Sequence, residues 1–167
     1  MSVFANGRRG DRVAGKSGGR SRSVTPHKSK RGDPTFNLLS GTIYGRKMKP
    51  DLCLKIYNPN RQTFLGSSVK VANQGATRRK GLLGRTHLAP GEGLWIIPCE
   101  AIHTFGMQFP IDLVYLDRKN RVKKLRSNVR PWRMSFCLTA YSVLELASGT
   151  IRDTHTQCGD VLQLFAE

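Results

Sequence analysis

The sequence predicts a mainly β (α+β) fold, a compact β-sandwich or a partly closed barrel of about eight short strands with two short helices. From Leu52 onward, short apolar runs alternate with turn residues, which is typical of a strand-rich domain. Two segments have helical character instead. A domain of about 120 residues buries roughly two-thirds of the surface that its unfolded chain exposes, so a single core can form.

The expected strands are short and separated by turn residues. In chain order they cover residues 52–57, 68–72, 93–97, 103–107, 111–116, 121–126, 142–147 and 161–165. The clearest apolar runs are the first three of these segments (LCLKIY, SVKVA, GLWII) and the last two (SVLELA, VLQLF). The expected helices cover residues 76–83, where Thr77 is the candidate cap, and 150–155.

A hairpin is expected to join the strands 111–116 and 121–126. Residues 117–120 (DRKN) have the chemistry of a tight turn, and Asn120 is able to take a positive φ. Alternation along 111–116 gives one wholly apolar face, whereas the other face carries Asp112 among apolar neighbours. A carboxyl group in that position needs a partner.

Charge is distributed unevenly along the 167 residues, which have 28 Lys and Arg against 11 Asp and Glu and a formal net charge of +17. Residues 1–47 carry 11 basic and 2 acidic side chains and are rich in Gly, Ser and Arg, which predicts a disordered basic tail. Residues 48–167 are expected to form a single globular domain. Met48 is an alternative start of the protein, and the other interpretation is a genuine tail that binds anionic partners.

Composition also disfavours several classes of protein. No run approaches the roughly 18 apolar residues of a membrane span, and the N-terminus lacks the apolar core of a secretory signal, so the expected location is the cytoplasm. The four cysteines contain no CxxC pair, and we expect free thiols and no cofactor. Residues 10–17 (GDRVAGKS) match a phosphate-binding loop in spelling, but neither a strand nor a helix flanks them, so nucleotide binding is rejected.

Several motifs follow one another in the second half of the chain. They are residues 80–85 (KGLLGR), 91–95 (GEGLW), 103–107 (HTFGM), 110–117 (PIDLVYLD), 130–131 (RP), 143–146 (VLEL), 149–150 (GT) and 159–160 (GD). In this order they resemble the domain of unknown function 192 family, over about residues 69–164. The resemblance implies a compact, mainly β domain with no established reaction, substrate or cofactor. Many relatives read Trp-Met-Lys-Asn-Thr where residues 105–109 read FGMQF, so two polar residues that could have formed a site are missing here.

Five residues of these motifs are candidate ligand-binding residues: Arg85, His103, Met107, Asp112 and Arg130. We expect Asp112 to hold Arg85 or Arg130 through charge-assisted hydrogen bonds. Such a pair is either structural or part of a pocket for an anionic or carbonyl-bearing ligand. Glu145 lies between two leucines and is expected to face solvent or a basic neighbour.

A metal site is not expected, although an alternative set of zinc ligands is Cys99, His103, His155 and Cys158. Four residues of extended strand span roughly 13 Å, so Cys99 and His103 would need a turn to share an ion. The same pair is the nearest combination of thiol and base in the sequence. A small-molecule or metal-dependent enzyme that uses the region of Cys99, His103 and Asp112 is therefore an alternative function.

The function that the sequence favours is a non-catalytic binding or accessory module whose partner is an anionic small ligand or a protein. Two basic patches, residues 78–80 (RRK) and 118–126 (RKNRVKKLR), would permit weak, non-specific nucleic-acid binding. Neither patch contains an aromatic residue, which disfavours stacking on single strands. Non-specific nucleic-acid binding through the basic tail is a further alternative.

Overall fold

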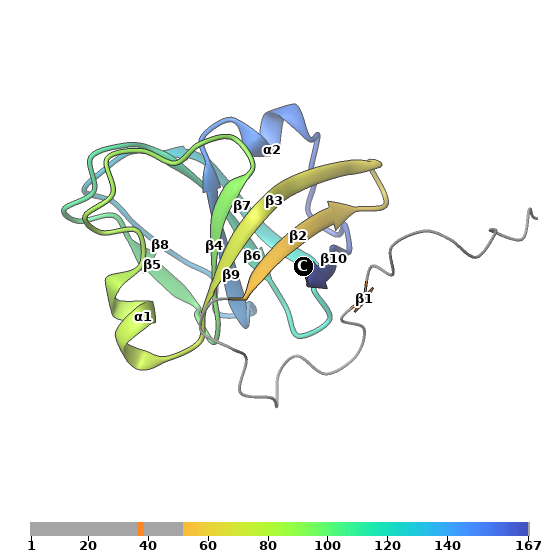
Figure 1. Ribbon diagram of the computed structural model, residues 1–167, viewed down its shortest axis with the longest axis horizontal. Helices are drawn as coiled ribbons and strands as arrows, with labels where there is room; N and C mark the ends of the chain where they lie inside the picture. Colours follow the sequence, from red (N-terminus) through yellow and green to blue (C-terminus); the bar gives the residue numbers. More distant parts are fainter. Residues whose placement is uncertain (1–36, 39–51, 167) are drawn as a thin grey trace, which may run out of the picture. The chain divides into compact units, whose positions relative to one another are not determined.

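The computed structural model describes residues 37–38 and 52–166, all of which lie in one unit of the chain, Thr35–Glu167 (Figure 1). Apart from residues 37–38, the predicted tail lies outside the described residues, as does the alternative start at Met48. The predicted mainly β fold is confirmed. The described residues form two sheets with two short helices, and neither sheet closes into a barrel.

The larger sheet has eight strands. They are β1 (Asn37–Leu38), β2 (Cys53–Asn58), β3 (Thr63–Ala72), β4 (Glu92–Ile96), β6 (Ile111–Leu116), β7 (Val122–Val129), β9 (Ser142–Ala147) and β10 (Gln163–Ala166). Their order across the sheet is β1-β10-β2-β3-β4-β9-β6-β7, and β3 and β4 are parallel. An isolated bridge between Arg121 and Val161 joins the start of β7 to the segment before β10, so the sheet curls.

The smaller sheet is the antiparallel pair of β5 (Ala101–His103) and β8 (Met134–Phe136). Helix α1 (Gly75–Lys80) connects the parallel strands β3 and β4, and α2 (Thr150–Asp153) follows β9. In Figure 1, α1 and the β5–β8 pair lie together, away from the β2–β3 hairpin. Among residues 52–166 there is no helix with the length and apolar character that a membrane crossing requires.

Two hydrophobic clusters cover opposite faces of the central strands. In β9, Leu144 and Leu146 belong to the cluster inside the curl, whereas Val143 and Ala147 belong to the cluster beneath α1 and the β5–β8 pair. Burying one such aliphatic side chain contributes about 1.5–3 kcal/mol. Both β6 and β9 are buried at every position, so a polar side chain in either strand has no solvent-facing side.

The predicted ranges 111–116 and 142–147 coincide with β6 and β9, and Asn120 takes the predicted positive φ, 57°. The strand expected at 103–107 is wrong beyond its first residue. The chain turns there instead, with the Met107 amide donating to the Thr104 carbonyl at 3.2 Å and Gly106 at a φ of 78°. Strand β8 is absent from the predicted set.

Helix α1 is shorter than the predicted range 76–83 because Gly81 ends it at a φ of 50°, a conformation that favours glycine. Thr77 does not occupy the N-cap, which is Gln74. It occupies the third helical position instead, where its Oγ1 accepts a hydrogen bond from the Gln74 amide at 3.2 Å. The last turn of α1 carries three consecutive cations, Arg78, Arg79 and Lys80.

Candidate functional site

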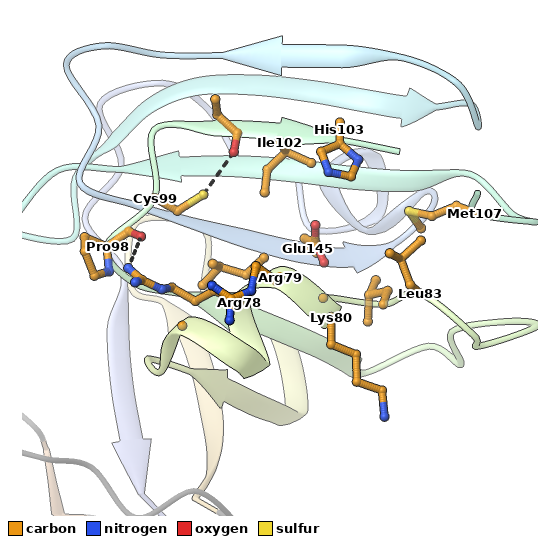
Figure 2. A pocket seen from close by; sticks show the side chains of 15 residues that line it. Arg78, Arg79, Lys80, Leu83, Pro98, Cys99, Ile102, His103, Met107 and Glu145 are labelled. Carbon is orange, nitrogen blue, oxygen red and sulfur yellow. Dashed lines mark hydrogen bonds between the residues drawn. The ribbon is translucent and has the colours of Figure 1, made fainter. Parts of the chain in front are cut away.

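A cavity of about 610 Å³ lies between α1, with the turn that follows it, and the segment that leads into and out of β5 (Figure 2). Strands β4 and β9 supply its floor. Its apolar lining comprises Leu82, Leu83, Ile96, Ile102 and Met107. Its polar and charged side chains are Arg78, Arg79, Lys80, Cys99, His103 and Glu145. The volume falls in the range of small-ligand sites, about 300–1,000 Å³.

Glu145 is a buried acid on the floor of this cavity. In β9 it pairs with Leu94 of β4 and Leu113 of β6, so its side chain lies on the sheet face that α1 and β5 cover. The side chain is 3% exposed and its Oε2 atom has no hydrogen-bond partner. Burial disfavours the charged form and raises the pKa of Glu145 to about 8. Glu145 therefore does not face solvent, and its carboxyl group is largely protonated at neutral pH.

Helix α1 brings its three cations to the rim of the cavity. The Arg78 Nη1 donates to the Pro98 carbonyl at 3.1 Å, which ties the helix to the opposite wall (Figure 2). Arg79 and Lys80 are exposed, and no ion pair joins either of them to another residue in the described part of the chain. Clustered cations beside a concave apolar surface create a positive potential that attracts anions.

The wall on the β5 side carries a thiol and an imidazole. Cys99 is half-buried and its Sγ donates to the Ala101 carbonyl at 3.1 Å. Burial raises the pKa of Cys99, so the group stays a thiol at neutral pH instead of becoming a nucleophilic thiolate. His103 is exposed and stacks on Phe105, with ring centroids 5.3 Å apart.

Asp112 is fully buried but does not pair with an arginine. Its Oδ1 accepts a hydrogen bond from the Asn128 amide at 2.8 Å, and its Oδ2 accepts from the amides of Gly149 at 3.1 Å and Ile151 at 2.8 Å. The expectation that Asp112 holds Arg85 or Arg130 is therefore wrong. The carboxylate fixes β7 and the start of α2 to β6, which is a structural task.

The two arginines lie elsewhere. Arg85 pairs with Glu92 at 3.2 Å, and Glu92 also accepts from the Ala89 amide, so this pair stabilises the turn before β4. Arg130 is exposed, and its carbonyl accepts a hydrogen bond from Thr104 Oγ1 at 2.8 Å. Of the five predicted ligand-binding residues, His103 and Met107 line the cavity, whereas Arg85, Asp112 and Arg130 do not.

The four alternative zinc ligands are not gathered in one place. Across the described ranges, no group of three or more His, Cys, Asp and Glu side chains could hold a metal ion. Cys99 and His103 share the cavity, whereas Cys158 is exposed and its thiol donates to the Lys123 carbonyl at 3.8 Å.

The sequence identifies Cys99 and His103 only as its nearest thiol and base, and it argues against their sharing an ion without a turn. It overlooks the role of Glu145 in the cavity and assigns residues 78–80 only to a basic surface patch. The signal for Glu145 is its position inside a strand that is otherwise apolar (SVLELA) and covered on both faces. A carboxyl group in such a strand is costly unless it has a partner or a task.

Comparison with known proteins supports the fold and the family. A crystallised protein of unknown function from Novosphingobium aromaticivorans is similar with a TM-score of 0.58 at 20% identity, over 66% of this chain and 82% of that one. A candidate transcription regulator from Sinorhizobium meliloti is similar with a TM-score of 0.59 at 19% identity, over 66% of this chain and 91% of that one. These similarities concern the fold alone. No protein with a curated description matches the chain. The family model described as uncharacterized ACR matches residues 56–164, and the chain thus belongs to the domain of unknown function 192 family.

Proposed function

We propose that this domain is a non-catalytic binding module whose cavity takes a small anionic ligand that also carries a carbonyl oxygen. The observation that carries the proposal is Glu145, a buried carboxyl group on the cavity floor with an oxygen that has no protein partner. Four other buried side-chain polar atoms of the described residues also have no partner, but of the five residues only Glu145 lines the cavity. Buried polar groups are nearly always hydrogen-bonded, so an unpartnered oxygen at the floor of an open cavity supports a bonding position for a ligand.

The chemistry of the ligand follows from the protonation of Glu145 and the charge of the rim. With a pKa of about 8, Glu145 is neutral at pH 7 and its O–H donates to a carbonyl oxygen. Arg79 and Lys80 on the rim are free to bind a carboxylate or phosphate group. The apolar side chains between rim and floor suit a short hydrocarbon body. The ligand class is therefore a small carboxylate or phosphate with a carbonyl group.

Binding has more support than catalysis. The enzyme alternative requires Cys99, His103 and Asp112 to act together, but Asp112 holds three backbone amides outside the cavity. The raised pKa of Cys99 also removes the thiolate that nucleophilic catalysis needs.

The test is a binding study with the full chain and a panel of small keto acids and phosphates. At least one compound is expected to raise the thermal midpoint (Tm) and to give a saturable Kd in calorimetry. Arg79→Gln and Lys80→Gln should each weaken that Kd by about tenfold, because each removes a charge-assisted hydrogen bond. Lys70→Gln on β3, which removes an exposed cation outside the cavity, is the matched control and should leave the Kd unchanged.

The pH dependence tests the assignment of Glu145. Wild-type affinity should fall as pH rises above about 8, because the ionised carboxylate no longer donates. The Glu145→Gln variant keeps a hydrogen-bond donor, so its affinity should be the same below and above about pH 8. The Glu145→Leu variant has no donor and should bind weakly at every pH. Affinity that rises above pH 8 would mean that the ligand pairs with the carboxylate, contrary to the proposal. A panel in which no compound binds would also reject it.

A further inference from the structure

The outer face of the β5–β8 pair is unusually apolar. We call it the apolar ribbon, and its residues are Phe105, Trp132, Met134, Phe136 and Leu138. Their exposure ranges from 41% for Phe105 to 78% for Leu138. Met134 and Phe136 are alternate residues of β8, so their side chains emerge on the same side of the strand. Trp132, in a bend, and Leu138, in a turn, lie just before and just after this strand.

The register of the small sheet explains why Met134 and Phe136 point outward. Ile102 pairs with Ser135 and both are buried, so the neighbouring positions on each strand face away from the core. Phe105 extends the ribbon by packing near Trp132, with ring centroids 5.8 Å apart. Exposed apolar side chains that are contiguous, unlike single ones, mark interaction surfaces.

Cations surround the apolar ribbon. Residues 118–133 contain eight Lys and Arg and no Asp or Glu. Lys124 lies 5.2 Å from the ring centroid of Phe136 and donates to its carbonyl at 2.7 Å. Arg126 pairs with Leu113, and Lys124 with Tyr115, so both cations lie on the sheet face on which the ribbon packs. Arg133 belongs to the ribbon segment itself and is exposed.

We propose that the apolar ribbon is a docking surface for an anionic lipid membrane, into whose interface its apolar side chains insert. Two of its most exposed members, Met134 and Leu138, are aliphatic, and such side chains partition into acyl chains but offer no ring for a nucleobase to stack on. Trp132 has the amphipathic ring that favours the headgroup level. The surrounding Lys and Arg match the negative charge of anionic headgroups.

Vesicle co-sedimentation of the full chain tests this surface. Two preparations are compared: vesicles of phosphatidylcholine alone and vesicles of phosphatidylcholine mixed equally with phosphatidylglycerol. The protein should bind the mixed vesicles, and the double variant Met134→Ser/Leu138→Ser should bind them about tenfold more weakly. Lys124→Gln and Arg133→Gln should each weaken binding about fivefold. Phe64→Ser, which removes an exposed aromatic side chain on β3, is the matched control and should bind like the wild type.

Tryptophan fluorescence gives a second readout that does not depend on the amount bound. The chain has two tryptophans, of which Trp95 is fully buried and Trp132 is exposed. Insertion of the ribbon should shift the emission of Trp132 to the blue, and Trp132→Phe should abolish the shift while retaining binding.

Three outcomes would overturn the proposal. Residues 1–47 are also basic, and unchanged binding by the Met134/Leu138 variant would mean that charge alone attracts the protein. Binding of a labelled oligothymidine, with none to the mixed vesicles, would assign the ribbon to nucleic acid. A concentration-dependent dimer that Leu138→Ser dissociates, again without vesicle binding, would assign it to a second copy of the chain.

Discussion

Replacing Glu145 by glutamine should stabilise the protein at neutral and alkaline pH. The pKa of Glu145 is raised from 4.5 in the unfolded chain to about 8 in the folded protein by burial. Between these two values the folded state holds a proton that the unfolded state has lost, so the free energy of unfolding falls as pH rises. The stability of the wild type is thus complete below about pH 4.5 and is reduced progressively up to about pH 8.

The size of the effect follows from the shift. One pKa unit corresponds to about 1.4 kcal/mol, so the whole interval amounts to about 5 kcal/mol, of which about 3 kcal/mol is already lost at pH 7. Glutamine has nearly the same shape and cannot ionise, so Glu145→Gln lacks this loss. The difference in unfolding free energy between variant and wild type should therefore grow by about 4 kcal/mol from about pH 5 to about pH 9.

Urea unfolding at several pH values, followed by far-ultraviolet circular dichroism, measures this difference directly. The comparison between variant and wild type cancels every titrating group that does not interact with Glu145. Cys99 is not one of these groups, because burial raises its pKa and the charge of Glu145 raises it further. Parallel stability curves, with a difference that changes by less than about 1 kcal/mol over the range, would refute the reasoning. They would mean that Glu145 is ionised in the folded state and neutralised by a cation of the rim.

Two further predictions concern the buried carboxylate of Asp112 and the free thiols of Cys99 and Cys158. Asp112→Ala should lower the free energy of unfolding by at least about 3 kcal/mol, because it leaves three amides without an acceptor. Asp112→Asn keeps one oxygen and should lower it by less. Equal urea midpoints for Asp112→Ala and wild type would contradict this role. At neutral pH, iodoacetamide should alkylate the exposed Cys158 well before Cys99, whose pKa is raised by burial, and peptide mass spectrometry that found Cys99 modified first would indicate a reactive thiolate instead.

The sequence predicts the central strands well because turn chemistry bounds them on both sides. The 117–120 turn, with its positive φ at Asn120, fixes where β6 ends and β7 begins. Strand β8 is harder to predict, since its outward side chains Met134 and Phe136 are apolar, whereas Ser135, which faces the core, is polar. A pattern of apolar and polar residues predicts burial only where the apolar side is the buried one.

The candidate site is less predictable for a related reason. Alternation in a single strand implies one polar face, so Glu145 is expected to be exposed; β9, however, lies in the middle of the sheet with a hydrophobic cluster on each face. The partners of Asp112 lie 16, 37 and 39 residues away and are backbone amides, which carry no signal in side-chain chemistry. Only the completed topology brings them together.

The cost of Glu145 to stability is itself an argument for its task. A leucine there, like its neighbours Leu144 and Leu146, would add apolar burial and avoid the loss of about 3 kcal/mol at pH 7. Stability that is given up at one position of a well-packed strand is characteristic of functional sites. Replacing a structural residue would lower the protein's free energy of unfolding. Glu145→Leu is expected instead to raise that free energy and to weaken ligand binding. These opposite signs are what separates a binding residue from a residue of the core.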